Sequence, residues 1–258
     1  MRLLLTHGFF LGEDAKEQEV MRPYPPLGIL YLCSYLRARG FNVDVYDSTF
    51  GARQELEAIL QTGAPGWLGV YGNLLTRRNV IRIVQTANAA GWRVIVGGPE
   101  PANYAEEFLA AGAEYVVPGE GETVLERLFS GDAAPPGVIF RDASGAIVRT
   151  APAPLIRDLD SLPWPARESV DIGRYLSAWR SRHGAGSVSL ITARGCPFEC
   201  RWCSHATFGR THRRRSVNAV ADEAEWILEQ YHPEMLWYAD DGAPRAQRAE
   251  EGPMCVTA

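Results

Sequence analysis

The sequence has little of several features that mark large classes of protein. It contains no run approaching ~20 uninterrupted apolar residues, so we expect no membrane span. The N-terminus reads MRLLLTHGFFLGEDAKEQ, a short apolar run soon followed by acidic residues, which does not fit a secretory signal peptide. The net charge is -5, whereas chains that coat nucleic acid usually carry a basic excess. These absences predict a cytoplasmic protein for which nucleic acid is not the expected partner.

Cysteine is also scarce, and its distribution is uneven. There are 5 cysteines, and three of them, Cys196, Cys200 and Cys203, lie in one short stretch. A disulfide framework would instead spread pairs through a small secreted domain. Cys33 lies in the apolar helical stretch ILYLCSYLRA and is expected to be a buried structural thiol, and we assign nothing to Cys255. Three thiols this close together predict a metal site, because thiolates bind soft or borderline metals.

Apolar runs alternate with helical patterns over the first 130 residues. Strands are expected at 2–7, 41–47, 67–72, 92–98 and 113–119, and helices at 27–40, 53–63, 77–91, 103–112 and 122–131. Buried parallel strands with helices on both faces follow from this order. The expected fold class is therefore α/β, with a flavodoxin-like doubly wound domain over residues 1–130. Ligands of such sheets bind at the carboxyl ends of the strands.

The remainder divides into three further segments. Residues 131–186 are expected to be a linker, with a hairpin at 138–150 around the turn Asp-Ala-Ser-Gly. Residues 187–241 form a new unit, in which we expect a strand at 188–195, the cysteine-bearing loop, a helix at 217–231 and a strand at 235–241. Residues 242–258 lack apolar periodicity and are expected to be a disordered tail.

The spacing of the three cysteines, Cys-x3-Cys-x2-Cys, leaves two interpretations open. A structural zinc site usually has four closed ligands, so zinc would need His205 or His212 as the fourth. A cubane 4Fe-4S cluster normally takes four cysteines. Three would leave one iron open, and an open coordination position lets a metal centre bind a reactant.

The stretch ITARGCPFECRWC resembles the radical S-adenosylmethionine (SAM) superfamily, whose signature has this spacing, an RGCP entry and an aromatic residue, here Trp202, before the last cysteine. The resemblance implies that Cys196, Cys200 and Cys203 ligate a 4Fe-4S cluster whose open iron chelates SAM. It further implies electron transfer to SAM, from a donor such as flavodoxin or ferredoxin, and a 5′-deoxyadenosyl radical that abstracts hydrogen from an unactivated carbon. Trp202, Asp240 and Asp241 are the implied SAM-binding candidates. The alternative for the two aspartates is ordinary solvated carboxylates at a strand end.

The first domain resembles the cobalamin-binding domain that precedes the barrel in many of these enzymes. The similarity lies in PPLGILYLCSYLRARGFNVDVYD, GNLLTRRN, VGGPEP, VPGEGE and RDLDSLPWPAR. The implied cobalamin contacts are Gly72, Asn73, Leu74, Thr76, Gly97, Gly98, Pro99, Gly119, Glu120 and Gly121. The cobalt-ligating motif Asp-x-His-x-x-Gly is absent, so His7 is expected to be an ordinary strand-end histidine. The nicotinamide fingerprint G-x-G-x-x-G is absent as well.

A basic run, from Arg201 to Arg215, follows the first two cysteines. Such a run can bind nucleic acid, but it is short and the chain is net acidic. We therefore expect these arginines to face solvent or carboxylates.

Three functions remain open. The resemblance favours a cobalamin-dependent enzyme that methylates an unactivated carbon of a small molecule, and the second hypothesis is a cyclase or rearranging enzyme of the same class without methyl transfer. A tRNA methylthiotransferase is disfavoured, because it would bring three more cysteines near the N-terminus. A closed barrel takes ~200 residues or more, and the stretch from Val188 to Ala258 is far shorter. The third hypothesis is accordingly a C-terminally truncated and catalytically inactive fragment, with only the first β/α units of a radical SAM barrel, that binds cobalamin or nothing.

Overall fold

The computed structural model describes residues 2–198, 200–201 and 207–240. Within this part a seven-stranded sheet has the order β2-β1-β3-β4-β5-β6-β7. Its strands are β1 (Arg2–His7), β2 (Asn42–Val45), β3 (Trp67–Tyr71), β4 (Arg93–Gly97), β5 (Tyr115–Val117), β6 (Ile139–Arg141) and β7 (Ile147–Arg149). The first five strands are parallel. The order 2-1-3-4-5 confirms the predicted flavodoxin-like sheet.

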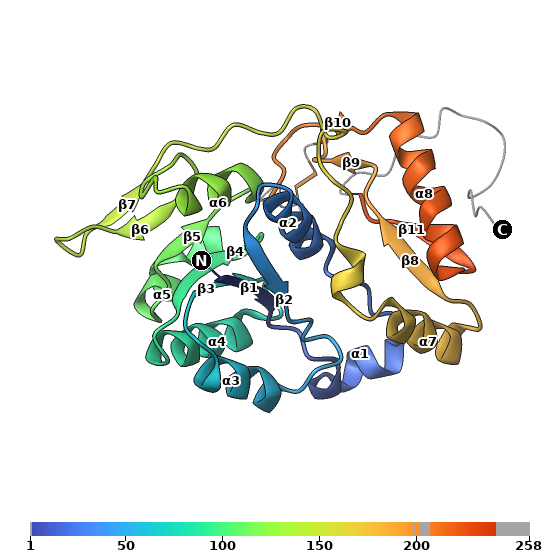
Figure 1. Ribbon diagram of the computed structural model, residues 1–258, viewed down its shortest axis with the longest axis horizontal. Coiled ribbons are helices and arrows are strands. Elements are labelled where there is room, and N and C mark those ends of the chain that lie inside the picture. Colours follow the sequence, from blue (N-terminus) through green and yellow to red (C-terminus); the bar gives the residue numbers. More distant parts are fainter. Residues whose placement is uncertain (1, 199, 202–206, 241–258) are drawn as a thin grey trace.

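Helices cover both faces of this sheet (Figure 1). One face carries α2 (Leu27–Arg37) and α6 (Glu122–Phe129), and the other carries α3 (Arg53–Thr62), α4 (Arg77–Ala89) and α5 (Ala105–Ala110). The alternation of side chains along β1 explains the two cores. Leu3 and Leu5 pack with α2 and α6, whereas Leu4 packs with α3, α4 and α5.

The segment after α6 is more ordered than a linker. The predicted hairpin is present as β6 and β7, and it extends the sheet because Val116 of β5 pairs antiparallel with Ile139 of β6. Helix α7 (Ile172–His183) was not predicted. Asp171 caps its first turn by accepting from the Arg174 backbone N–H. Shorter elements that were also not assigned are α1 (Ala15–Val20) and the 3-10 helices η1 (Leu11–Glu13), η2 (Pro101–Tyr104) and η3 (Arg167–Ser169).

The second unit has the predicted order of strand, loop, helix and strand. It comprises β8 (Ser187–Leu190), β9 (Ala193–Arg194), β10 (Arg213–Arg214), α8 (Val217–Tyr231) and β11 (Met235–Tyr238). Strands β8 and β11 are parallel, and β9 and β10 are antiparallel. The strand expected at 188–195 is two strands, because the Thr192 backbone N–H donates to Asp240 Oδ1 (2.7 Å) and not to a neighbouring strand. The tail predicted at 242–258 lies outside the described residues.

None of the helices in the described ranges has the length and apolar character needed to cross a lipid bilayer.

Candidate cysteine loop and strand-end site

Two of the three clustered cysteines lie in the described part of the chain, on what we call the cysteine loop (residues 195–212). Cys196 is buried, Cys200 is exposed, and both are free thiols. The third thiol, Cys203, and the neighbouring Trp202 fall outside the described residues, as does His205. Among the residues that the structure describes, no three cysteine, histidine or acidic side chains form a metal-binding group. Two free thiols on one loop are suitable soft donors, so the ligand set stays a prediction from the spacing.

The base of the cysteine loop is closed by a short antiparallel ladder. Arg194 of β9 pairs with Arg213 of β10, so the residues on either side of the loop lie together. Gly195 follows directly with φ +83°, and a Cβ at this position would lie 2.5 Å from the Thr211 carbonyl oxygen. Only glycine allows this left-handed turn so close to another backbone. The turn brings Cys196 out of the ladder and into the loop.

The arginine that precedes the loop is buried between two carboxylates and two aromatic rings. Arg194 Nη1 donates to Glu120 Oε1 (2.8 Å) and its Nη2 donates to Glu122 Oε1 (2.6 Å). Its guanidinium lies 5.3 Å from the Tyr31 ring centroid and 5.1 Å from that of Phe208. Burial alone would lower the pKa of Arg194, but the attraction and hydrogen bonds of Glu122 and Glu120 outweigh it and raise that pKa. Arg194 therefore stays charged while buried.

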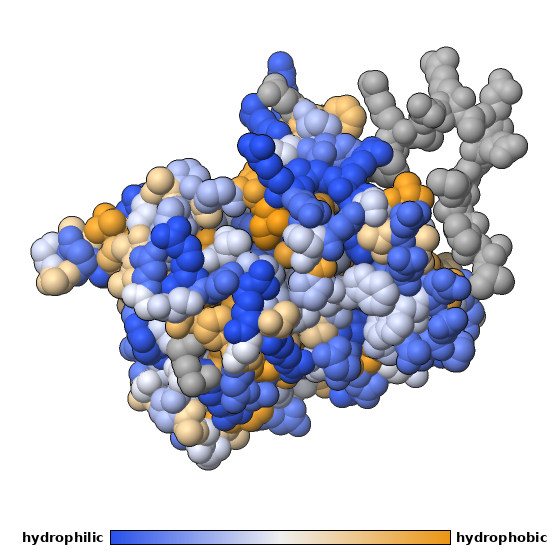
Figure 2. Space-filling view, turned by 45° about the horizontal axis from the view of Figure 1, so that its top comes forward, coloured by the Kyte–Doolittle hydropathy of each residue, from blue (hydrophilic) through white to orange (hydrophobic). Residues whose placement is uncertain are grey.

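Two arginines around β10 face carboxylates, one of the two surroundings predicted for the basic run. Arg213 pairs with Glu120, and Arg215 pairs with Glu223 of α8. Figure 2 shows hydrophilic residues gathered at the top of the molecule, over the end where Figure 1 places β10. His212, one of the candidate zinc ligands, accepts a hydrogen bond from Arg214 Nε to its Nε2 (3.3 Å).

Asp240, a SAM-binding candidate, lies just after β11 and is engaged with the backbone. Its Oδ1 accepts from the backbone N–H groups of Thr192 (2.7 Å) and Ala193 (3.0 Å). Its Oδ2 accepts from the Thr192 hydroxyl. The carboxylate thus fixes the turn that leads into β9. Asp241, the other aspartate candidate, lies outside the described residues.

The ten candidate cobalamin contacts lie at the carboxyl ends of three adjacent strands. We call these loops the strand-end site: 72–76 after β3, 97–99 after β4 and 119–121 after β5. The first two loops are joined by a hydrogen bond from the Gly72 N–H to the Gly97 carbonyl oxygen (2.8 Å). The topology therefore brings the predicted residues to one edge of the sheet.

The loop after β3 presents apolar side chains to solvent. The Thr76 N–H donates to Asn73 Oδ1 (3.0 Å), and the Asn73 N–H donates to Thr76 Oγ1 (3.1 Å). With its two ends held in this way, the loop leaves Leu74 68% and Leu75 86% exposed. Leu75 was not among the predicted contacts, although it adjoins one. Two exposed leucines at strand ends offer surface to a flat apolar ligand.

Glu120 and Thr76 are buried, so not every predicted contact faces the strand-end surface. The Glu120 carboxylate is directed at Arg194 and Arg213. Its contacts favour a role in holding the cysteine loop over a direct cobalamin contact.

His7 confirms the expectation of an ordinary strand-end histidine. The Phe9 N–H donates to His7 Nδ1 (3.2 Å), which assigns the ring proton to Nε2. That Nε2 lies 3.0 Å from Asp47 Oδ1. Both ring nitrogens are occupied and the side chain is buried, so His7 is not placed to ligate cobalt.

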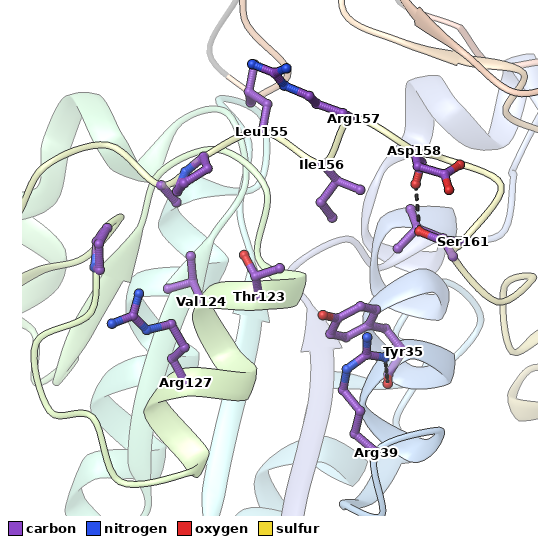
Figure 3. Close-up of a pocket in the computed structure, with 14 residues that line it drawn as sticks. Tyr35, Arg39, Thr123, Val124, Arg127, Leu155, Ile156, Arg157, Asp158 and Ser161 are labelled. Atoms are coloured by element: carbon purple, nitrogen blue, oxygen red, sulfur yellow. Dashed lines mark hydrogen bonds between the residues drawn. The ribbon is translucent and has the colours of Figure 1, made fainter.

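A separate pocket of about 450 Å³ lies between α2, α6 and the segment 153–162 (Figure 3). The pocket is lined by Tyr35 of α2, by Arg39 just past the end of α2, by Thr123 and Arg127 of α6, and by Arg157 of the connecting segment. Its lining includes neither Cys196 nor Cys200 and none of the predicted strand-end residues. The pocket is therefore distinct from the candidate site.

Comparison with known proteins bears on both parts of the chain. Residues 19–129 match the family model of the B12-binding domain. An uncharacterized methyltransferase of Pyrococcus horikoshii is 26% identical over 247 residues, which are 89% of this chain and 51% of the relative. The anaerobic magnesium-protoporphyrin IX monomethyl ester cyclase of Cereibacter sphaeroides is 26% identical over 258 residues, 93% of this chain and 41% of the cyclase. The chain thus spans about half the length of these curated relatives or less.

Two solved structures share the fold across both parts of the chain. The radical S-adenosylmethionine methyltransferase TsrM from Kitasatospora setae superposes with a TM-score of 0.70 at 21% identity, covering 93% of this chain and 47% of TsrM. The cobalamin-dependent S-adenosylmethionine radical enzyme OxsB superposes with a TM-score of 0.72 at 19% identity, covering 93% of this chain and 34% of OxsB. Residues 19–129 thus match the B12-binding domain, and the fold of the chain, including the part that bears the cysteine motif, is that of two radical S-adenosylmethionine enzymes.

Proposed function

We propose that the protein is a cobalamin-dependent radical SAM iron-sulfur enzyme that methylates an unactivated carbon of a small molecule. The observation that carries the proposal is the direct attachment of the cysteine loop to the B12-binding domain. Arg194 precedes the first cysteine by two residues, and it pairs with Glu120 in the loop after β5 and with Glu122 at the start of α6. The cysteine loop, suited to a cluster, is thus attached to the domain whose strand-end site is suited to cobalamin.

The proposed division of the chain follows from this arrangement. Residues 1–130 hold cobalamin, 131–186 connect the parts, and 187–241 begin the radical SAM domain. Cys196, Cys200 and Cys203 hold the cluster. A three-cysteine cluster supplies one electron through an open iron, and cobalamin supplies a cobalt that carries a methyl group. An electron donor such as flavodoxin or ferredoxin is the proposed partner.

The residues of the strand-end site have different tasks in this proposal. Leu74 and Leu75 would pack against the corrin ring, since both are exposed apolar side chains at the strand ends. Gly72, Gly97 and Gly98 would let the ligand approach the backbone closely. Asp240 would position the turn before β9, and Trp202 and Asp241 stay candidates for SAM contact.

A second function, cyclisation without methyl transfer, is favoured by one specific observation. The magnesium-protoporphyrin ester cyclase is as similar to this chain, at 26% identity, as the uncharacterized methyltransferase. The two activities differ in the fate of the SAM methyl group. With methyl-labelled SAM, methyl transfer predicts label in the corrin fraction, whereas cyclisation leaves it in methionine.

The cluster is tested by anaerobic reconstitution of the chain with iron and sulfide. We expect about four irons and four sulfides per chain, with the loss of most of both in Cys196→Ala and Cys200→Ala. Cys33→Ala is the matched control, because Cys33 is a buried thiol on α2 close to Ser169 and outside the loop. It should retain the wild-type iron content.

Two results would contradict the cluster. One is about one zinc per chain without iron. The other is an iron content that Cys33→Ala lowers as much as Cys200→Ala does. Iron that binds with no label transfer and no SAM cleavage would point to the inactive-fragment hypothesis.

A further inference from the structure

A single buried carboxylate joins both ends of the cysteine loop. Glu120 lies in the turn between β5 and α6, and its side chain is 3% exposed. Its Oε1 accepts from Arg194 Nη1 (2.8 Å), just before the loop. Arg213 Nη1, just after the loop, lies 3.0 Å from Oε1 and 2.9 Å from Oε2. Arg194 and Arg213 are also paired partners in the β9–β10 ladder. Glu120 therefore binds the two residues between which the cysteine loop begins and ends.

The same carboxylate also holds the segment that connects the two parts of the chain. Glu120 Oε2 accepts from the Ile156 backbone N–H (2.8 Å). Arg213 Nη1 in turn donates to the Ile156 carbonyl oxygen (2.6 Å). A carboxylate has about four acceptor positions, and these contacts use them. Three segments that are far apart in the sequence therefore meet at Glu120.

The charges in this cluster are balanced and buried. Glu122 Oε1 accepts from Arg194 Nη2 (2.6 Å), so two carboxylates face two guanidiniums. The exposed fractions are 3% for Glu120, 5% for Glu122, 4% for Arg194 and 12% for Arg213. A buried charge that loses its partner is strongly unfavourable. A shift of the loop base away from the turn after β5 would separate these charges, so the cluster favours one placement of the loop.

We propose that Glu120 is a positioning residue that fixes the base of the cysteine loop against the strand-end site. The proposal rests on the proposed function only in giving the loop a cluster to hold, because the anchoring contacts involve this chain's own residues. Glu120 acts through Arg194 and Arg213 and not on a substrate. Replacing Glu120 is expected to increase local opening at the base of the loop more than it increases opening in the rest of the domain.

The anchoring is tested on the full chain without cofactors, by hydrogen–deuterium exchange of peptides that cover residues 207–216. In Glu120→Gln we expect exchange there to be about tenfold faster or more, as for a segment that opens locally. Glu126→Gln is the matched control. Glu126 lies on α6, the helix that follows Glu120, and its ion pair with Arg39 is 36% exposed on each side. Exchange of 207–216 should not change in that control.

A second variant separates anchoring from folding. Glu120→Gln leaves one guanidinium without a counter-charge, which destabilises the whole chain. Glu120→Gln combined with Arg213→Met removes one charge of each sign and leaves Arg194 paired with Glu122. This double variant should regain a thermal midpoint near that of the wild type while its 207–216 exchange stays fast. If exchange of 207–216 follows only the thermal midpoint, the positioning role is wrong.

The iron content after reconstitution with iron and sulfide tests whether this anchoring also matters for the cluster. The double variant should retain roughly half or less of the wild-type iron. If the wild type binds no iron but exchange accelerates as expected, the proposed function fails and the anchoring stands. If the variant exchanges fast but holds full wild-type iron, Glu120 does not position the cluster ligands, and the inference is overturned.

Discussion

Gly98 occupies the tightest point of the strand-end site. Its φ is +107°, and a Cβ at this position would lie 2.3 Å from the Gly72 carbonyl oxygen. Gly97, its neighbour, would bring a Cβ no nearer than 3.7 Å to the Val117 carbonyl oxygen. The backbone therefore leaves room for a side chain at position 97 but not at position 98. Gly98 keeps the loops after β3 and β4 in contact, which shapes the surface proposed for cobalamin.

Gly98→Ala is expected to lower the free energy of unfolding by about 2 kcal/mol or more, because it combines backbone strain with a backbone clash. Gly97→Ala is the matched control and should change it by less than about 1 kcal/mol. Urea unfolding of both variants measures this difference in the free energy of unfolding. The absorption of added hydroxocobalamin shows, separately, whether each variant still binds the corrin. Equal stability of the two variants would show that the contact between the two loops does not constrain position 98.

Single residues also show what the sequence could and could not reveal. The strand-end glycines could be expected from turn chemistry, whereas Leu74 could be singled out only from the resemblance of GNLLTRRN to a cobalamin-domain loop. The structure places both at strand ends. The partners of Glu120 could not be predicted, since Arg194 lies 74 positions away and no local pattern links the two. The same holds for His7, whose partner Asp47 is 40 positions distant.

At the scale of elements, α7 is tied to the ends of β1 and β2 by one carboxylate. Tyr175 of α7 donates to Asp47 Oδ2 (2.6 Å), and His7 Nε2 lies 3.0 Å from Asp47 Oδ1. Burial alone would raise the pKa of Asp47, but the hydrogen bonds from His7 and Tyr175 outweigh it and lower that pKa. Burial, together with Asp47, raises the pKa of Tyr175. The carboxylate therefore stays ionised while the phenol stays protonated.

This lowered pKa makes a pH-dependent contribution to stability. In the unfolded chain the carboxyl titrates near ~3.9. The Asp47 contribution is thus complete above about pH 5, and it is lost as the pH falls through the lower folded value. Asp47→Asn should be less stable than the wild type near pH 7, and the gap should narrow as the pH drops below about 4.

Urea midpoints measured from pH 7 to pH 3 check this prediction. Asp44→Asn is the control. Asp44 is on β2, three residues before Asp47, and the side chains of its ion pair with Arg2 are 48% and 41% exposed. The Asp44→Asn change is therefore expected to lower the free energy of unfolding by at most about 1 kcal/mol at any pH. A gap for Asp47→Asn that does not vary with pH would mean that the charge of Asp47 is not what His7 and Tyr175 stabilise.

Most elements of the sheet were predictable because their pattern is local. Apolar runs gave the five parallel strands, and helical spacing gave the helices between them. Helix α7 was missed because a proline-rich stretch precedes it, although Ile172, Tyr175, Leu176 and Trp179 recur at helical spacing and are buried. The attachment of β6 to β5 depends on pairing between distant segments, which periodicity does not specify.

At the scale of the whole molecule, buried ion pairs join the B12-binding domain and its connecting segment to the second unit. The Glu120 cluster is one junction. A second junction is Arg167 of η3, whose Nη1 lies 2.6 Å from Glu223 Oε1 of α8, with both side chains 0% exposed. Arg215 reaches the other oxygen of Glu223. The two parts were predictable separately from their motifs. Their mutual placement was not, because it depends on charges that meet only in the folded chain.

The central claim is that one chain holds an iron-sulfur cluster and a cobalamin on adjoining loops. The most direct test is to assay iron, sulfide, zinc and cobalt on a single sample, reconstituted anaerobically with iron, sulfide and hydroxocobalamin and then freed of unbound cofactor. The account predicts about four irons, about four sulfides and about one cobalt per chain, with little zinc. Zinc without iron, or iron without cobalt, would contradict it.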